Sequence, residues 1–257
     1  MSKRMRPQAQ EHPAKASCMD QARTCMARAS SIAVLTGAGI SAESGIPTFR
    51  GPGGAWEEFR LEDMATQAGF DRDPVKVWQW YGLRRRIIDS AQPNAGHLAL
   101  AELERRTPSF TLVTQNIDGL HQRAGSRNIL EIHGNIWTLR CISCHREWRD
   151  TTVPLPPLPH CECGGLARPA VVWFGELLPG NVWRMAEHAT ADCEVFLVVG
   201  TSAVVYPAAG LIELAHRSGA KVIEVNTETT AMSSVADCSI LGPAGEIVPG
   251  LVARNRG

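Results

Sequence analysis

The sequence predicts an α/β fold: a doubly wound, Rossmann-like parallel sheet with a smaller inserted lobe made of a helical segment and a zinc ribbon. Three observations support this. Short apolar runs alternate with helical stretches, a glycine-rich turn follows the first apolar run, and four cysteines gather in a proline-rich insertion. Continuous apolar runs are typical of parallel strands that are buried on both faces.

Five apolar runs predict strands, and four stretches between them predict helices. The strands are expected at Ile32–Leu35, Phe110–Val113, Ile129–Ile132, Val195–Val199 and Lys221–Val225, and the helices at Gln21–Ala29, Ala95–Arg106, Val182–Ala189 and Pro207–Arg217. Residues 18–50, 92–140 and 169–257 would form the discontinuous Rossmann-like domain, interrupted by a helical insertion at 51–91 and a zinc-binding insertion at 141–168.

Composition narrows the class of protein. The chain has 257 residues, enough for one sizeable domain and an insertion. Its 26 basic and 26 acidic residues balance, so no overall field would attract nucleic acid or an anionic membrane. No apolar stretch approaches the ~18 residues that span a bilayer. We expect a cytoplasmic protein without direct nucleic-acid or membrane partners, in which residues 1–17 form a flexible leader.

The first predicted strand leads into a phosphate-binding type of turn. Gly37, Gly39 and Ala42 form a G-x-G-x-x-A pattern, in which the glycines allow a tight turn and close approach of the backbone to a ligand. Backbone N–H groups at the start of the next helix could then face a pyrophosphate.

The residues after this turn differ from those of an ordinary dinucleotide fold. The acidic residue expected about 20 positions on would be Glu57 or Glu58, but no apolar strand precedes them, which argues against an NAD-dependent oxidoreductase. The loop instead carries Phe49 and Arg50, an aromatic ring and a fixed cation suited to a nucleotide.

Four cysteines have the spacing of a metal site. Cys141 and Cys144 form C-x2-C, and Cys161 and Cys163 form C-x-C after a further 16 residues. Four thiolates can close a tetrahedron around Zn²⁺ and leave no position for water, so we predict one structural zinc ion. Zinc would supply the folding free energy that so short an insertion cannot draw from a core. His160, beside Cys161, leaves a Cys3His site as an alternative.

The other four cysteines do not suggest a disulfide framework. Cys18, Cys25, Cys193 and Cys238 are scattered through the chain. We expect all four to be reduced, with Cys193 and Cys238 packed as small core side chains.

Polar side chains follow two of the predicted strands. Asn116 and Asp118 come after Phe110–Val113, and His133 comes after the run from Ile129. Ligands of open α/β sheets bind at the carboxyl ends of strands. Asn116 could hold a carboxamide, Asp118 could accept from an amide or hydroxyl, and His133 could be either a base or a structural histidine.

Taken together, these motifs resemble the sirtuins, the NAD-dependent protein lysine deacylases. Residues 36–51 resemble the first cofactor-binding motif of that family, and Gln115–Gly119 with His133–Gly134 resemble the second and third. The resemblance runs in the family's order from about Ser31 to Leu251. It implies that NAD is the co-substrate and that acylated-lysine proteins or peptides are the partners.

The resemblance also implies roles for individual residues. His133 would be the general base on a ribose hydroxyl, Asn116 and Asp118 would form the nicotinamide pocket, and Phe49 would shield the reactive ribose carbon. The implied cofactor contacts are Gly37, Ala38, Gly39, Ile40, Ser41, Ser44, Thr48, Phe49, Arg50, Trp56, Gln115, Asn116, Ile117, Asp118, Gly200, Thr201, Ser202, Asn226, Thr227, Glu228 and Ala244. Val172, Phe174 and Gly175 resemble the stretch that pairs with the substrate peptide as an added strand.

The acyl group is suggested by two residues of a helix predicted to start near Pro74. Tyr81 and Arg84 are three positions apart and share a face, so phenol and guanidinium could hold a carboxylate in one cavity. Arg84 also opens a run of three arginines, which are more often a solvated face.

The pair resembles the signature of the desuccinylase and demalonylase branch of the sirtuins, which Thr48 and Ala65 also match. The resemblance therefore implies that succinyl, malonyl and also acetyl groups are removed from lysine, giving nicotinamide, O-acyl-ADP-ribose and free lysine. A deacetylase without acidic preference and an NAD-dependent ADP-ribosyltransferase are the alternatives.

Overall fold

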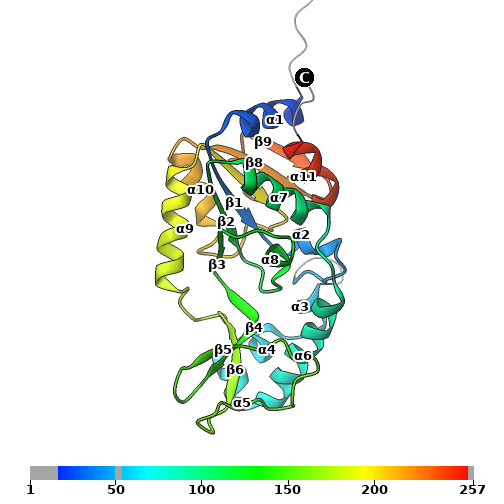
Figure 1. The fold of residues 1–257 in the computed structure, drawn as a ribbon, viewed down its shortest axis with the longest axis vertical. Coiled ribbons are helices and arrows are strands. Elements are labelled where there is room, and N and C mark those ends of the chain that lie inside the picture. Colours follow the sequence, from blue (N-terminus) through cyan, green and yellow to red (C-terminus); the bar gives the residue numbers. More distant parts are fainter. Residues whose placement is uncertain (1–16, 50–53, 254–257) are drawn as a thin grey trace, which may run out of the picture.

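A six-stranded parallel sheet forms the centre of the larger lobe (Figure 1). The computed structural model describes residues 17–49 and 54–253. Across the sheet the strands are β3 (Ile129–Glu131), β2 (Ser109–Thr114), β1 (Ser31–Thr36), β7 (Val195–Val199), β8 (Lys221–Asn226) and β9 (Cys238–Leu241). The chain builds the sheet outward in one direction from β1 and in the other from β7. The boundary between these two strands is therefore the point at which ligands bind in such folds.

The strands form where the apolar runs predict them. Every residue of β7 is buried, as are all residues of β1 after Ser31, because helices cover both faces of the sheet. The five predicted strands are confirmed. The sixth, β9, was not predicted, since it has only four residues and only Cys238 among them is buried.

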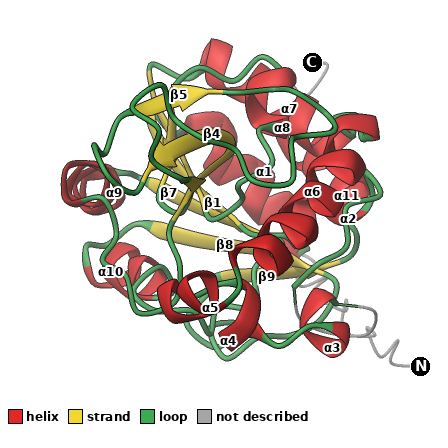
Figure 2. Cartoon of the chain, turned by 90° about the horizontal axis from the view of Figure 1, so that it is seen from below, coloured by secondary structure: helices red, strands yellow, loops and turns green. Residues whose placement is uncertain are grey.

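Helices cover both faces of the sheet, which confirms the doubly wound class (Figure 2). Helices α1 (Cys18–Arg28), α7 (Ala95–Arg106) and α11 (Ala244–Val252) pack on one face, and α9 (Gly180–Asp192) and α10 (Gly210–Arg217) pack on the other. Two short helices, α2 (Gly39–Ala42) and α8 (Leu120–Arg123), follow β1 and β2. Helix α7 has the predicted bounds because Asn94 and His97 form a capping box at its start.

The smaller lobe combines the helical insertion with a second sheet. Its elements are α3 (Ala55–Glu58), α4 (Leu61–Met64), α5 (Gln67–Arg72) and α6 (Pro74–Ser90), with the antiparallel strands β4 (Gly134–Cys141), β5 (Glu147–Arg149) and β6 (Ala167–Val171) in the order β5-β4-β6. This sheet starts at Gly134 and ends at Val171, so it extends past the 141–168 bounds expected for the zinc insertion. Trp78, Trp137 and Trp173 lie in its core.

The three consecutive arginines, residues 84–86, lie in helix α6 at the edge of this core. Asp73 caps the helix by accepting from the Lys76 backbone N–H at 3.0 Å. Arg84 and Arg85 are buried and Arg86 is exposed. The run is therefore not one solvated face: two of its members point inward.

One expectation about the cysteines was wrong. Cys18 and Cys238 form a disulfide that ties α1 to β9, with their Cα atoms 5.7 Å apart. The chain gives no local sign of this pair, because 220 positions separate the two residues. Cys25 and Cys193 are free, and Cys193 is buried as expected. Among the described residues, no helix is long and apolar enough to cross a membrane.

Candidate active site

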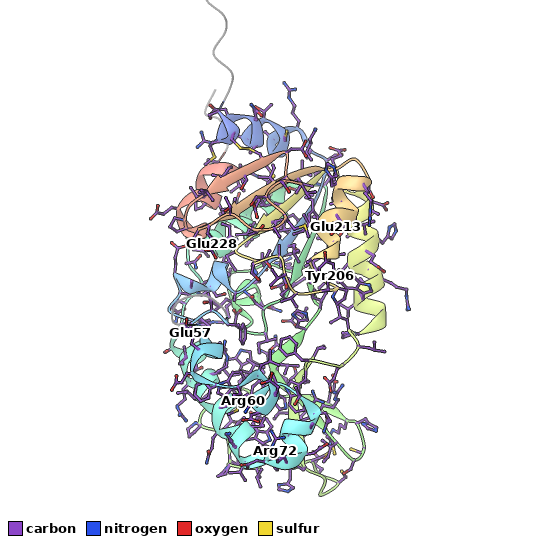
Figure 3. All side chains as sticks on the ribbon, turned by 180° about the vertical axis from the view of Figure 1, so that it is seen from behind. Glu57, Arg60, Arg72, Tyr206, Glu213 and Glu228 are labelled. Carbon is purple, nitrogen blue, oxygen red and sulfur yellow. A yellow bond between two sulfur atoms is a disulfide. The ribbon has the colours of Figure 1, made fainter. Side chains whose placement is uncertain are left out.

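A cavity of about 480 Å³ opens at the carboxyl ends of the central strands, where the strand order reverses. Its wall on the side of the parallel sheet comes from the loops after β1, β2, β7 and β8, and its opposite wall comes from the smaller lobe. Tyr206 and Glu228, which both line it, lie above the helical segment that carries Glu57 and Arg60 (Figure 3). The volume is in the range of small-molecule sites.

The structure brings most of the predicted residues to this cavity. Those that line it are Gly37, Ala38, Gly39, Thr48, Phe49, Ala65, Tyr81, Gln115, Asn116, Ile117, His133, Val172, Phe174, Gly175, Gly200, Thr201, Ser202, Asn226, Thr227 and Glu228. A second cavity of about 10 Å³ adjoins it through shared residues, Ala38, Phe49, Asn116 and Ile117. Ser41, Arg84 and Asp118 line this smaller cavity.

Three described residues of the predicted set are not among the lining residues. Ile40 is fully buried in the core, Ser44 accepts a hydrogen bond from the Asn94 side chain, and Ala244 is buried at the start of α11. Arg50 lies outside the described residues, and so does the Trp56 side chain.

The floor of the cavity is made of backbone. Gly37 N–H donates to the Val199 carbonyl at 3.0 Å, and Gly39 N–H donates to the Gly200 carbonyl at 2.8 Å. A Cβ on Gly39 would lie 2.8 Å from the Gly200 backbone, too close for any side chain. Because these glycines have no side chains, the loop that follows β7 can pack directly against their backbone, and room is left for a ligand.

His133 has the geometry of a neutral base. Its Nδ1 lies 3.1 Å from the Gln115 carbonyl oxygen, which can only accept, so Nδ1 carries the proton and Nε2 has a free lone pair. Burial lowers the pKa of His133, and the Gln115 carbonyl opposes that shift. The ring is therefore unprotonated near neutral pH.

Ser41 is the centre of a buried polar network beneath both cavities. Its hydroxyl donates to Asp118 Oδ2 at 2.8 Å and accepts from Asn116 Nδ2 at 3.2 Å. His97 Nε2 lies 3.4 Å from the same hydroxyl, and Asp118 Oδ1 accepts from the Leu120 backbone N–H at 2.8 Å. Because the amide nitrogen of Asn116 is held in this network, its oxygen is left for a ligand.

The two buried histidines next to this network serve the scaffold. Burial lowers the pKa of His97 to about 4 and places that of His121 well below its usual value. His121 Nε2 contacts the Thr36 hydroxyl at 2.9 Å and lies away from both cavities. Both rings are neutral hydrogen-bonding groups.

Tyr81 and Arg84 line different cavities, and Phe49 lines both of them. Tyr81 lines the larger cavity, and its hydroxyl accepts a hydrogen bond from Trp173 Nε1 at 2.8 Å. Arg84 lines the smaller cavity, with its guanidinium carbon 4.4 Å from the centroid of the Phe49 ring. The two residues therefore do not line the single cavity that was expected, but two adjoining ones.

Arg84 is a buried cation that shares the smaller cavity with one buried carboxylate, that of Asp118. Within the part of the chain that the structure describes, it forms no ion pair, and its Nε has no hydrogen-bond partner. Burial lowers its pKa, opposed by Tyr81 and by the more distant Asp118. Burying an unpaired charge is costly, so the site is suited to an anion.

The segment after β6 carries backbone groups along the cavity mouth. Val172 N–H donates to the His133 carbonyl and Phe174 N–H donates to the Ala65 carbonyl, each at 2.9 Å. These bonds attach the segment to His133 and Ala65, which both line the larger cavity. Gly175 follows at φ +88°, which turns the chain back toward α9.

The four cysteines are placed to hold a zinc ion. Their Sγ atoms lie within 4.8 Å of one another, and three of the pairs are 3.5–3.7 Å apart. A tetrahedral site with Zn–S bonds of about 2.3 Å needs sulfurs about 3.8 Å apart. Backbone N–H groups of Cys144 and Ser143 lower the pKa of the Cys141 thiol to about 6, which favours the thiolate. His160 is not in this group, since its Nδ1 donates to the Leu158 carbonyl.

The chain was compared with known proteins. Residues 37–207 match the Sir2 family. An NAD-dependent protein deacylase of Aquifex aeolicus (strain VF5) is 55% identical over 208 residues, which are 80% of this chain and 87% of that protein. This chain is a sirtuin. A second relative, NAD-dependent protein deacylase 2 of Pyrobaculum aerophilum, is 53% identical over 221 residues, 85% of this chain and 88% of that one.

Solved sirtuin structures share the fold closely. A Sir2 homologue in complex with NAD is 46% identical with a TM-score of 0.86, covering 91% of this sirtuin and 92% of that chain. A Sir2 protein bound to a myristoylated histone peptide is 38% identical with a TM-score of 0.76, covering 91% and 94%. Sirtuins use NAD as co-substrate, and the large cavity at the strand ends of this sirtuin is of a size to receive it.

Several lining residues of this sirtuin were missed from the sequence. They are Trp80, Val171, Trp173, Glu176, Leu178, Val205, Tyr206 and Pro207 in the larger cavity, and Ile46, Pro47 and Ile88 in the smaller one. Trp80 and Trp173 had a usable signal, because each is next to a residue that was singled out. The others read as ordinary core or loop positions.

Proposed function

We propose that this sirtuin is an NAD-dependent protein lysine deacylase that removes succinyl and malonyl groups, and also acetyl groups, giving nicotinamide, O-acyl-ADP-ribose and free lysine. The buried, unpaired guanidinium of Arg84 carries the proposed preference for acidic acyl groups. A carboxylate on the acyl chain would give Arg84 the close ion pair that it does not form with any described residue.

The cofactor end of the cavity supports the use of NAD. When bound, NAD supplies a ribose carbon whose bond to nicotinamide can break, so that the acyl oxygen can take its place. Asn116, with its amide nitrogen held by Ser41, would accept from the nicotinamide carboxamide. Gln115 and Asn226, which are hydrogen-bonded to Thr201, would hold the ribose and phosphate groups.

The base and the walls of the cavity have separate tasks. His133 Nε2 would take the proton of a ribose hydroxyl, because its other nitrogen is fixed on Gln115. Phe49 would keep water from the reactive carbon. Val172 and Phe174 would pair with the peptide backbone, which threads the acyl-lysine between Ala65 and His133.

The size of the acyl effect can be estimated. A hydrogen bond to a charged group contributes about 1.5–3 kcal/mol. Lost from the complex with an acidic acyl group only, this corresponds to about 10- to 150-fold in kcat/KM.

The test replaces Arg84 and compares two substrates. Arg84→Met should lower desuccinylation about 10- to 150-fold and leave deacetylation of the same peptide within a few-fold. Arg86→Met is the matched control, since it removes an exposed arginine from the same run and helix. Mass spectrometry of succinyl-lysine and acetyl-lysine peptides, with and without NAD, measures both rates.

The outcomes separate the alternatives. Equal loss of both activities in Arg84→Met would refute the acidic preference and leave a general deacetylase. No NAD-dependent loss of either group from the wild type would refute deacylation. Labelled NAD appearing on protein in that case would indicate ADP-ribosyl transfer.

A further inference from the structure

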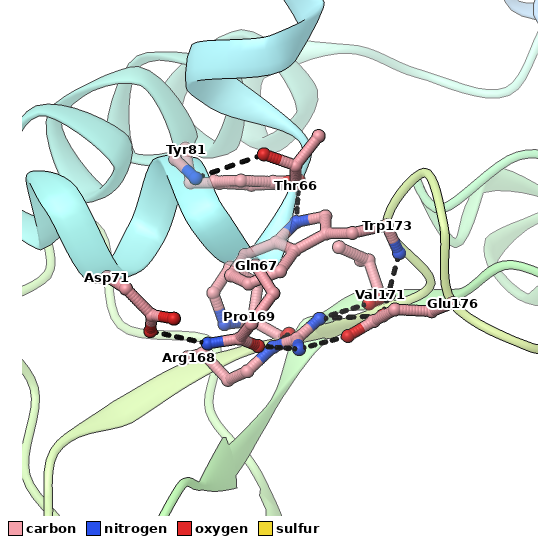
Figure 4. Close-up of polar contacts among 10 residues, drawn as sticks. Thr66, Gln67, Asp71, Tyr81, Arg168, Pro169, Val171, Trp173 and Glu176 are labelled. Carbon is pink, nitrogen blue, oxygen red and sulfur yellow. Dashed lines mark hydrogen bonds and ion pairs between the residues drawn. The ribbon is translucent and has the colours of Figure 1, made fainter.

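Trp173 connects the acyl end of the cavity to a buried ion pair. It lies just after β6 and only 2% of its surface is exposed. Its indole Nε1 donates to the Tyr81 hydroxyl at 2.8 Å, although 92 positions separate the two residues (Figure 4). Both side chains line the larger cavity.

This hydrogen bond determines what the Tyr81 hydroxyl can do. A phenol has one proton, and an indole N–H can only donate, so the oxygen of Tyr81 must accept from Trp173. Its own proton is left for another acceptor, and no described residue is hydrogen-bonded to it. Burial raises the pKa of Tyr81 to about 12, so the hydroxyl keeps that proton. Tyr81 therefore offers a donor to whatever enters the cavity.

Contacts with Arg168, Glu176 and Phe70 fix the orientation of the Trp173 ring. The Arg168 guanidinium carbon lies 3.4 Å from the centroid of that ring, and Glu176 holds Arg168 through two contacts of 2.5 and 3.0 Å. Glu176 also accepts from the Trp173 backbone N–H at 2.8 Å (Figure 4). The Phe70 ring packs against Trp173 with centroids 5.3 Å apart. The indole thus has little freedom to turn its N–H elsewhere.

We infer that Trp173 is a positioning residue for acyl specificity: its indole turns the Tyr81 hydroxyl so that its proton points at the carboxylate of an acidic acyl group beside Arg84. The inference rests on the proposed function and adds a residue that contacts Tyr81, not Arg84. Arg168 and Glu176 hold the indole in place with every substrate. The proton of the Tyr81 hydroxyl affects only those acyl groups whose carboxylate can accept it.

The first experiment is a double-mutant cycle. Trp173→Phe keeps an aromatic ring over Arg168 and removes the N–H. It should lower the ratio of kcat/KM for a succinyl-lysine peptide to kcat/KM for an acetyl-lysine peptide about 2- to 12-fold, the range for one neutral hydrogen bond. Tyr81→Phe removes the hydrogen bond to the charged carboxylate itself, so it should lower this ratio more, about 10- to 150-fold. The double variant should be no worse than Tyr81→Phe alone.

The matched control is Trp78→Phe. Trp78 is also a buried tryptophan of the smaller lobe, and its indole donates to a backbone carbonyl, that of Ala167, at 2.9 Å. It lines neither cavity. Its replacement has a comparable structural cost but should leave the ratio of desuccinylation to deacetylation as it is in the wild type.

The outcomes distinguish this inference from the proposed function. If Arg84→Met depresses desuccinylation selectively but Trp173→Phe leaves the ratio unchanged, the role of Trp173 is refuted and the acidic preference stands. If Arg84→Met lowers desuccinylation and deacetylation equally, the proposed preference for acidic acyl groups is refuted, and the role of Trp173 is refuted with it. Should Trp173→Phe fold poorly, benzothienylalanine at position 173 keeps the shape of the indole without its N–H. An unchanged ratio with that analogue overturns the inference.

Discussion

Glu224 offers a test of how the cofactor end of the cavity is held in shape. This glutamate sits inside β8 and is only 3% exposed. Its carboxylate accepts from the hydroxyls of Thr230 at 2.6 Å, Ser233 at 2.5 Å and Ser239 at 2.7 Å. The segment between β8 and β9 begins with Thr227 and Glu228, which line the cavity. One buried carboxylate thus fastens the loop beside the proposed NAD site.

The magnitude follows from those three bonds. Hydrogen bonds to a charged group contribute about 1.5–3 kcal/mol each and neutral ones about 0.5–1.5. Glu224→Gln makes the acceptor neutral, which costs about 1–1.5 kcal/mol for each of the three bonds, so we expect the free energy of unfolding to fall by about 3–4.5 kcal/mol. In the variant, binding of NAD must also order the loop. If this ordering costs about 1.4 kcal/mol of the binding free energy, the KM for NAD rises about tenfold.

Two assays check the prediction. Urea denaturation measures the stability change, and steady-state kinetics at saturating peptide measures the KM for NAD. Glu102→Gln, an exposed glutamate on α7, should change neither. A KM for NAD that stays at the wild-type value, or a KM for peptide that rises by the same factor, would refute the argument that Glu224 acts through the cofactor loop.

Two further predictions concern the base and the metal. Because burial holds the pKa of His133 below 6.5 and the base acts unprotonated, kcat/KM on an acetyl-lysine peptide should fall as pH drops through a midpoint below 6.5; a midpoint at or above 6.5 would contradict the assignment. Zinc analysis should find about one ion per chain, and Cys144→Ser should lose the ion with a lower melting temperature, while Cys25→Ser keeps it. Full zinc content in Cys144→Ser would show that the metal binds elsewhere.

The sequence predicted the sheet well because its strands are continuous apolar runs. Val195–Val199 can be nothing but a buried strand, and its ends match the structure. The edge strand β9 was not predicted because it is only four residues long, and its core-facing residues Cys238 and Ile240 alternate with Ser239 and the exposed Leu241. Glu224 is a residue whose burial the sequence does not predict. A charged residue in an apolar run is expected to be exposed, but three hydroxyl groups satisfy this carboxylate inside the protein.

The site was predictable where a motif fixes it and not where it depends on contacts between distant residues. His133 and Asn116 follow strand ends, so their place at the cavity could be inferred from position alone. The Trp173–Tyr81 bond joins side chains of two different elements, and no local pattern encodes it. Arg84 was ambiguous for a related reason, because a run of arginines does not say which members face inward.

The backbone floor of the cavity limits how this enzyme could be redesigned. Gly37, Gly39 and Gly200 interlock so tightly that a Cβ on Gly200 would lie 2.4 Å from the Ile40 nitrogen, where Gly200 has φ +62°. At the end of the cavity nearest those loops, these three glycine positions therefore accept no side chain. The opposite end is built from Ala65 and large aromatic rings, which can be swapped one at a time. Libraries aimed at a new acyl group can be confined to that end, with the co-substrate held constant.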